Sequence, residues 1–184
     1  MTVGALVLAA GLSRRMGAAK LALPVSGRPM LAATVEAVEA AGLPLLVVIG
    51  GHANAVLEAV PGRGTVFAER YARGLSQSLK AGLLAAPEDW AAALVVLGDM
   101  PFVRADTLRM LADALRAGAR AVVPVHKGRR GNPAGFARSE WPALMALSGD
   151  QGARRLLDRL GAEQVPVSDP GIHRDIDVPA DLPD

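Results

Sequence analysis

The chain has 184 residues, of which 51% are hydrophobic and 21% charged, and its formal net charge at pH 7 is +2. This length and composition predict a single domain over residues 1–184 and exclude long disordered stretches. Only 3% of the residues are aromatic and no basic stripe is present, which excludes the usual nucleic-acid binders. The absence of cysteine excludes disulfides, cysteine-ligated zinc and thiol catalysis, and it fits a reducing compartment.

The apolar start of the chain does not have the pattern of an export signal. No positive charge precedes residues 3–12, and Arg14 and Arg15 follow where a signal-peptide cleavage site is expected. No apolar run approaches the length that spans a bilayer. We therefore expect a cytoplasmic protein with neither a nucleic-acid nor a membrane partner.

Short apolar runs without polar alternation recur along the chain, which is typical of strands that are covered on both faces. Three strong runs span 3–8, 45–49 and 93–97, and each stops at small residues. A weaker fourth run spans 121–125, and 163–167 is expected to be an edge strand.

Between these strands, apolar residues recur at the three- and four-residue spacing of amphipathic helices. The first predicted helix begins at Pro29 and stops at Gly42, since proline suits a first helical turn and glycine a helix end. Asp106 and Asp150 are the expected N-caps of two later helices, the second of which ends at Gly161. The expected buried faces are Leu31, Val35 and Val38; Leu75, Leu79, Gly82 and Leu83; Leu108, Leu111, Ala112 and Leu115; and Ala153, Leu156, Leu157 and Leu160.

The alternation of strands and helices predicts a three-layer, Rossmann-like α/β fold, in which helices cover both faces of a mainly parallel central sheet. Ligands of such folds bind at the carboxyl ends of the strands, near a change in strand order. The loop that follows the first strand is therefore a candidate binding site.

Residues 8–20 form this candidate loop. The small residues at 9–11 let a ligand approach the backbone, whose N–H groups can donate to phosphate oxygens. Arg15 and Lys20 can neutralise a polyphosphate, arginine as a planar fork and lysine as a mobile charge. The spacing matches neither the P-loop nor the G-x-G-x-x-G fingerprint, so a surface turn with solvated arginines is the alternative.

Six segments, in order along nearly the whole chain, resemble motifs of the molybdenum cofactor nucleotidyltransferases within the NTP-transferase superfamily, and most closely of the cytidylyl-transferring members. The segments are 8–20, 74–79, 97–101, 130–133, 149–154 and 175–179. The first and third are shared with the wider superfamily, so they indicate the reaction class rather than the substrate. The resemblance implies the nucleotidyltransferase form of the three-layer fold, with Mg2+ as cofactor.

The resemblance also implies that Asp99 is a principal metal ligand and Asp177 a supporting one, with Asp175 as the competitor for the second position. An aspartate pair is chemically sufficient, because Mg2+ takes one or two carboxylates together with substrate phosphates and waters. The alternative role of Asp99 is a turn or a helix cap before Pro101, and that of Asp177 is to cap a short terminal helix.

For the nucleotide, the resemblance implies that Arg15, Lys20 and Asp99 are catalytic, because transfer at phosphorus depends on positioning and charge neutralisation. Ser76 and Ser78 either read the base or cap the helix that starts near them. The alanine-alanine-glycine form of the first motif and the serine-glutamine-serine form of the second favour CTP over GTP. The complete nucleotide-binding set is Leu8, Ala9, Ala10, Gly11, Arg15, Lys20, Ser76, Ser78 and Asp99.

For the acceptor, the resemblance implies a pterin phosphate that is held by residues of the fourth and fifth segments. A charged hairpin tip is the alternative role of the fourth segment, and a helix cap is the alternative role of Asp150. The expected acceptor-binding residues are Arg130, Gly131, Asn132, Asp150 and Arg154.

The implied reaction is transfer of CMP from MgCTP to the terminal phosphate of molybdenum-loaded molybdopterin, which gives molybdopterin cytosine dinucleotide and pyrophosphate. The alternatives are GMP transfer to the same acceptor, a sugar-phosphate-type nucleotidyltransferase, and a carrier that delivers the cofactor to a molybdenum hydroxylase. The expected partners are CTP and a molybdopterin-type cofactor, and a recipient hydroxylase is compatible with the enzyme as well as with the carrier. Magnesium-dependent release of pyrophosphate separates the enzymes from the carrier.

Overall fold

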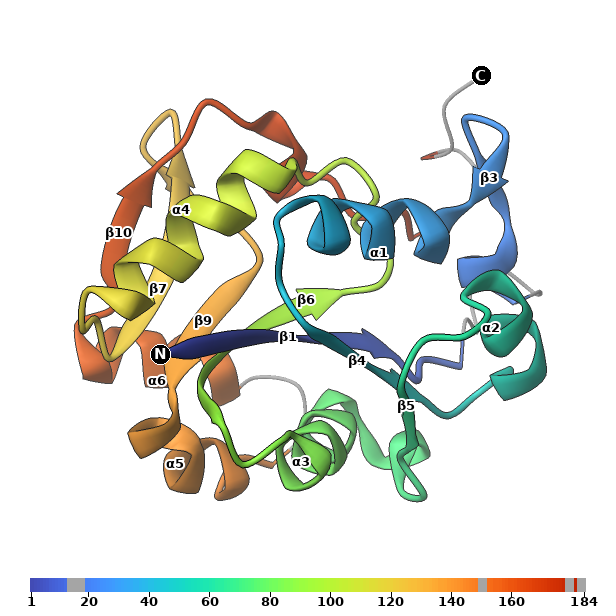
Figure 1. The fold of residues 1–184 in the computed structure, drawn as a ribbon, viewed down its shortest axis with the longest axis horizontal. Coiled ribbons are helices and arrows are strands. Elements are labelled where there is room, and N and C mark those ends of the chain that lie inside the picture. The colour runs from blue at the N-terminus through green and yellow to red at the C-terminus, as the bar shows by residue number, and fades with distance from the viewer. Residues whose placement is uncertain (13–18, 149–151, 178–180, 182–184) are drawn as a thin grey trace.

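The computed structural model describes residues 1–12, 19–148, 152–177 and 181, and a central sheet runs through the middle of the molecule (Figure 1). Its strands are Thr2–Ala9 (β1), Leu45–Ile49 (β4), Thr65–Phe67 (β5), Trp90–Leu97 (β6), Ala121–His126 (β7), Arg129–Arg130 (β8), Ala134–Ala137 (β9) and Glu163–Pro166 (β10). They lie in the order β10-β7-β9-β6-β1-β4-β5, with β8 beside β7. A separate hairpin pairs Pro24–Val25 (β2) with Arg28–Pro29 (β3).

Most neighbouring strands of the sheet are parallel, which confirms the predicted architecture. β1 is flanked by β4 and β6, so that Val7 lies opposite Val47 on one side and Val96 on the other. β4 pairs in parallel with β5 and β7 with β10, whereas β9 runs against both β6 and β7. The predicted strands all form, and β10 lies at the edge of the sheet as expected.

Helices cover both faces of the sheet, and β1 therefore buries side chains on both of its faces. Its odd-numbered residues from Val3 to Ala9 pack in one core with residues of α1 (Met30–Ala40) and α4 (Ala105–Arg116). Leu6 and Leu8 pack in a second core on the other face. In Figure 1 the first layer lies above the sheet and the second below it. The remaining helices are α2 (Ala53–Ala59), α3 (Leu75–Ala85), α5 (Trp141–Met145) and α6 (Gly152–Leu160), with 3-10 turns at Lys20–Ala22 (η1), Tyr71–Arg73 (η2), Arg138–Glu140 (η3) and Pro170–His173 (η4).

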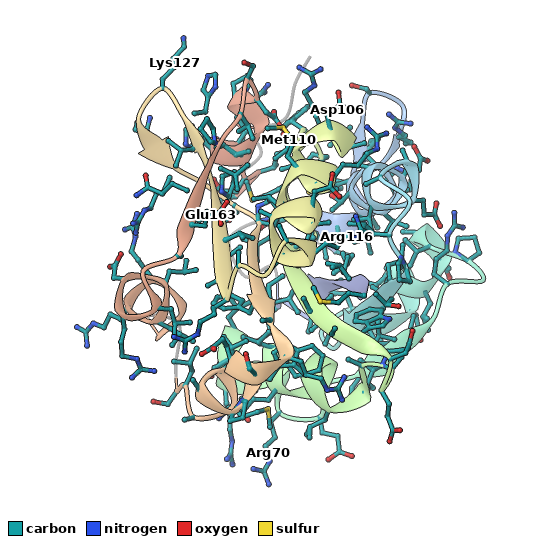
Figure 2. All side chains as sticks on the ribbon, turned by 60° about the vertical axis from the view of Figure 1, so that its left-hand side comes forward. Arg70, Asp106, Met110, Arg116, Lys127 and Glu163 are labelled. Carbon is teal, nitrogen blue, oxygen red and sulfur yellow. The ribbon has the colours of Figure 1, made fainter. Side chains whose placement is uncertain are left out.

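The predicted helix faces are largely correct. Leu108, Leu111 and Leu115 are buried on α4, while Met110 and Arg116 lie on its outer side (Figure 2). Leu75 was expected in the core, but its side chain is exposed at the first residue of α3. α1 ends as predicted, with Gly42 in the left-handed region at a φ of +72°.

The prediction that Asp106 caps α4 is wrong. The N-cap position belongs to Arg104, and Asp106 lies in the first turn, where it pairs with Arg109. Asp169, which comes from the end of the chain, supplies the carboxylate at this helix start instead: its Oδ2 accepts from the Arg104 N–H at 2.9 Å. The other predicted cap, Asp150, lies outside the described residues.

The C-terminal strap, which we define as residues 167–177, runs along the carboxyl ends of the strands. At its start, the Val167 N–H donates to the Val125 carbonyl at 2.9 Å. Further along, the Ile172 carbonyl accepts from the Asn132 N–H at 2.9 Å. Near its end, Ile176 N–H donates to the Asp99 carbonyl at 3.1 Å. The strap therefore connects the carboxyl end of β7 with the residues that directly follow the carboxyl end of β6.

No helix within the described ranges is long and apolar enough to cross a membrane.

Candidate active site

The end of β1 lies against the ends of both neighbouring strands. The Leu8 carbonyl accepts from Gly98 N–H at 3.0 Å, and the Ala10 carbonyl accepts from Gly51 N–H at 3.1 Å. Ala9 and Ala10 are buried, and Gly11 is exposed at the start of the loop. Gly51 fits here because it carries no side chain: a Cβ would lie 2.8 Å from the Gly11 carbonyl oxygen. The predicted binding loop thus begins at the carboxyl edge of the sheet.

A lysine lies between two carboxylates at this edge. Lys20 stands in η1, and its Nζ lies 2.8 Å from Asp99 Oδ2 and 2.9 Å from Asp177 Oδ1. The Lys20 side chain is only 9% exposed, whereas those of Asp99 and Asp177 are 24% and 40% exposed. The ammonium is therefore buried beneath carboxylates that still face solvent. We call these three residues the Lys20 centre.

Asp99 and Asp177 stabilise the charge of Lys20. Burial alone would lower the pKa of the Lys20 ammonium, but the hydrogen bonds with Asp99 and Asp177 outweigh that effect and raise the pKa above its ordinary value. Lys20 is thus protonated at neutral pH. Among the described residues, the two carboxylates and one ammonium of this group carry a net negative charge at a partly open position, which suits a divalent cation.

The donor set fits Mg2+ better than a metal that requires an all-protein cage. Within the described ranges, no group of three or more His, Cys, Asp or Glu residues could hold a metal ion. Mg2+ needs only one or two carboxylates, since phosphates and waters complete its octahedron. Asp99 and Asp177 both accept hydrogen bonds from the Lys20 ammonium, so their carboxylates already meet at one positively charged group. Asp175, the predicted competitor, is exposed, and it is Asp177 that pairs with Lys20.

The two serines of the second motif are buried at the start of α3. Gly74 is the N-cap of this helix, and no side chain of a described residue caps it there. The Ser76 hydroxyl is buried and has no hydrogen-bond partner among the described residues. Ser78 is buried as well. A buried hydroxyl without a partner is costly, so Ser76 is available to a ligand or a water.

Three of the predicted acceptor residues, Arg130, Gly131 and Asn132, lie at the end of β8 and just after it, beside the carboxyl end of β7 and the strap. Arg130 pairs with Asp158 on α6, and Gly131 N–H donates to the Pro124 carbonyl at 3.0 Å. Asn132 is followed by a cis peptide bond to Pro133. Arg154 is exposed on α6. Arg15 and Asp150, the remaining predicted site residues, lie outside the described residues.

The sequence patterns did not single out His52, which contacts the binding loop. Its Nε2 lies 3.1 Å from the Leu12 carbonyl, and its backbone has a φ of +57°. The available signal was the pair of glycines directly before it, after the second apolar run. Residues other than glycine are uncommon in this left-handed region, although histidine is one of the types that are enriched there.

A mainly parallel sheet that gathers a glycine-containing loop, a lysine and two carboxylates at one carboxyl edge is typical of nucleotide-binding α/β proteins. The chain belongs to the MobA-like NTP transferase domain family, whose model matches residues 5–165. Its fold is the Rossmann-like fold of the NTP transferases. Asp177 and the whole of the strap lie after the matched range.

Two named relatives match different shares of their own length. The purine catabolism protein PucB of Bacillus subtilis is 33% identical over 186 residues, which cover 94% of this chain and 90% of PucB. The bifunctional protein GlmU of Pelobacter propionicus is 36% identical over 143 residues, which cover 74% of this chain and 30% of GlmU. The chain thus spans about a third of the length of the GlmU relatives that it matches.

Solved structures share the fold along almost the whole chain. Rv0371c of Mycobacterium tuberculosis H37Rv has a TM-score of 0.89 at 31% identity, covering 98% of this chain and 95% of its own. A manganese complex of Rv0371c has a TM-score of 0.85 at 29% identity, with 98% and 96% covered. The molybdopterin-guanine dinucleotide biosynthesis protein A of Archaeoglobus fulgidus has the same fold, with a TM-score of 0.73 at 22% identity and 99% and 95% covered.

Proposed function

We propose that the chain transfers CMP from CTP to the terminal phosphate of molybdenum-loaded molybdopterin, giving molybdopterin cytosine dinucleotide and pyrophosphate. The observation that carries this proposal is the Lys20 centre, in which Lys20 meets Asp99 and Asp177 at the carboxyl edge of the sheet. Family membership supports nucleotidyl transfer, and the likeness of segments 130–133 and 149–154 to the molybdenum cofactor enzymes supports the acceptor.

Asp99 and Asp177 would hold a magnesium ion, which when bound supplies positive charge to the triphosphate and to the departing pyrophosphate. Their carboxylates suit this role because they are partly exposed and point to one positive charge. The manganese complex of Rv0371c supports a divalent metal in a protein of this fold.

Lys20 and Arg15 would bind the phosphates of CTP and hold the α-phosphorus in line with the acceptor. An oxygen of the molybdopterin phosphate attacks this phosphorus, a new P–O bond forms, and the bond to the β-phosphate oxygen breaks. Pyrophosphate leaves with the electron pair of that bond. No side-chain base is needed for the nucleophile, because a phosphomonoester is largely dianionic near neutral pH. The chain contributes positioning and charge, which are the main requirements of transfer at phosphorus.

The choice of CTP rests on the first and second motifs. The small residues Ala9, Ala10 and Gly11 resemble the cytidylyl-transferring members rather than those that use GTP. Ser76 offers a buried hydroxyl that lacks a partner among the described residues, and we assign it to recognition of the base or the ribose. Ser78, which is buried on the same helix, supports this part of the nucleotide site.

The acceptor would lie between the tip of β7 and the Lys20 centre. Arg130 ends β8, which pairs with β7, and Asn132 follows it; the strap joins Asn132 to Asp99 by backbone hydrogen bonds. Asp150 and Arg154 complete the proposed acceptor site. A molybdenum hydroxylase that receives the product is the proposed macromolecular partner, and a composition without cysteine fits activity in the cytoplasm.

The test is release of pyrophosphate from CTP, GTP, ATP or UTP, with magnesium and with or without molybdenum-loaded molybdopterin. We expect CTP to give the fastest release and omission of either magnesium or the acceptor to abolish it. Faster release from GTP would make the protein a guanylyltransferase, and release only with a sugar phosphate would change the acceptor. Tight molybdopterin binding without any pyrophosphate release would contradict the transferase proposal and favour a carrier of the cofactor.

A further inference from the structure

Asp169 is a buried carboxylate that lies outside the Lys20 centre. It is 2% exposed, and both of its oxygens accept hydrogen bonds. Oδ2 accepts from Arg104 N–H at 2.9 Å and from the Thr107 hydroxyl at 2.7 Å, and Oδ1 accepts from Gly171 N–H at 2.8 Å. The carboxylate therefore joins the start of the strap to the start of α4.

Both segments that Asp169 joins lead to the Lys20 centre. α4 follows the turn that begins at Asp99, and the strap ends at Asp177. Between these ends, the strap fits tightly under the turn: a Cβ on Gly171 would lie 2.1 Å from the Phe102 carbonyl oxygen. Ile176 then donates to the Asp99 carbonyl. A shift of the strap at Asp169 would be carried along a close-packed segment to the carboxylate of Asp177.

We infer that Asp169 is a positioning residue that sets the place of the Asp177 carboxylate relative to Asp99, and thereby the affinity of the site for a divalent-metal nucleotide. This inference rests on the proposed function of the Lys20 centre. Groups that orient metal ligands typically change metal affinity about 10–100-fold when they are removed. A residue that only caps α4 would lower stability and leave that affinity unchanged.

The experiment measures binding of Mn2+ together with CTP, and separately with GTP, by the loss of the free-Mn2+ paramagnetic resonance signal. Wild-type protein is compared with Asp169→Ala and Thr107→Val at a temperature where circular dichroism shows each to be folded. Asp169→Ala should weaken Mn2+ binding about 10–100-fold. Thr107→Val removes one of the three hydrogen bonds and should weaken it about 2–10-fold.

The matched control is Glu140→Ala, which removes another buried carboxylate with two hydrogen-bond donors. Glu140 accepts from Arg120 Nε at 2.8 Å and from the Ser139 hydroxyl at 3.2 Å, and it belongs to the η3 turn rather than to the strap. We expect this variant to unfold at a lower temperature and to bind Mn2+ and nucleotide as the wild type does.

Unchanged Mn2+ binding by Asp169→Ala, or equal weakening in Asp169→Ala and Glu140→Ala, would overturn the positioning role. If Asp169→Ala does not fold, unchanged binding by Thr107→Val overturns the role by itself. Absence of Mn2+–nucleotide binding in the wild type is a different result, because it removes the proposed function together with the inference that rests on it.

Discussion

Lys20 and Asp99 are 79 positions apart in the chain, yet the Lys20 ammonium lies 2.8 Å from an Asp99 carboxylate oxygen. Two parallel neighbouring strands make this contact possible. β1 leads into the loop that ends at Lys20, and β6 ends directly before the turn with Asp99, so both residues reach the same edge of the sheet. Asp177 arrives there from the opposite end of the chain.

Asp177→Asn should lower the rate of pyrophosphate release about 10–100-fold, because an amide is a weaker magnesium ligand and loses the charge pair with Lys20. Asp175→Asn is the matched control, since Asp175 is exposed on the same segment, and it should change the rate no more than about two-fold. The measurement is the steady-state rate of pyrophosphate release by both variants and the wild type at saturating magnesium and CTP. A larger effect from Asp175 would reverse the assignment of the second metal ligand.

Lys20→Met should weaken both stability and activity. Its loss leaves two facing carboxylates without their buried counter-charge, and since these are partly exposed we expect a cost of about 1–2 kcal/mol in the free energy of unfolding. Pyrophosphate release should fall about 10–100-fold through the lost phosphate contact. Urea unfolding and rate measurements check these values, with Lys80→Met on α3 as the control. A fully active Lys20→Met protein would contradict the phosphate role.

Gly131→Ala tests how closely the tip of β7 approaches the strap. A Cβ at this position would lie 2.4 Å from the Ile172 carbonyl oxygen, which is backbone and cannot turn aside. We expect the free energy of unfolding to fall by about 1–3 kcal/mol and the Tm to fall by several degrees. At Gly64 the nearest atom to a new Cβ is 3.7 Å away, so Gly64→Ala should stay within about 0.5 kcal/mol of the wild type. Equal Tm values for the two variants would contradict this close approach of the strap to Gly131.

Glu140 gives a pH-dependent contribution to stability that is independent of the active site. The hydrogen bond from Arg120 is the main cause that lowers the pKa of the Glu140 carboxyl, against the opposing effect of burial. A lowered pKa in the folded state stabilises the protein above the unfolded pKa, and this stabilisation is lost as the pH falls through the folded pKa. Glu140→Gln should therefore lower the Tm at pH 7 relative to the wild type, and the difference should shrink below about pH 4. A difference that stays constant over this range would contradict the linkage.

The strands and helix faces were predictable because each depends on a local pattern. Val3 to Leu8 is apolar at every position, and the structure shows the reason: alternate residues face two different helical layers. Asp99 could be placed at the carboxyl edge because it follows such a run. Leu75 was misassigned because helical spacing predicts which residues share a face and does not show whether that face is covered at the first residue of the helix.

Contacts between distant segments could not be read from the sequence. Asp106 stands where a cap is expected, yet the carboxylate at the start of α4 comes from Asp169, which no local pattern connects with that helix. The sequence marked Lys20, Asp99 and Asp177 as separate candidates, and the fold supplies the hydrogen bonds between them. Their roles toward nucleotide and metal remain predictions.

The most direct test of the Lys20 centre as a magnesium-nucleotide site is thermal unfolding of the wild type and Asp99→Asn with magnesium and each of CTP, GTP, ATP and UTP. A nucleotide at about one hundred times its Kd stabilises the folded protein by about 2.7 kcal/mol, which raises the Tm by roughly 5–10 °C for a chain of this size. We predict that CTP gives this shift with magnesium, and that the shift disappears without magnesium and in Asp99→Asn. An equal CTP shift in the wild type and in Asp99→Asn would contradict the account.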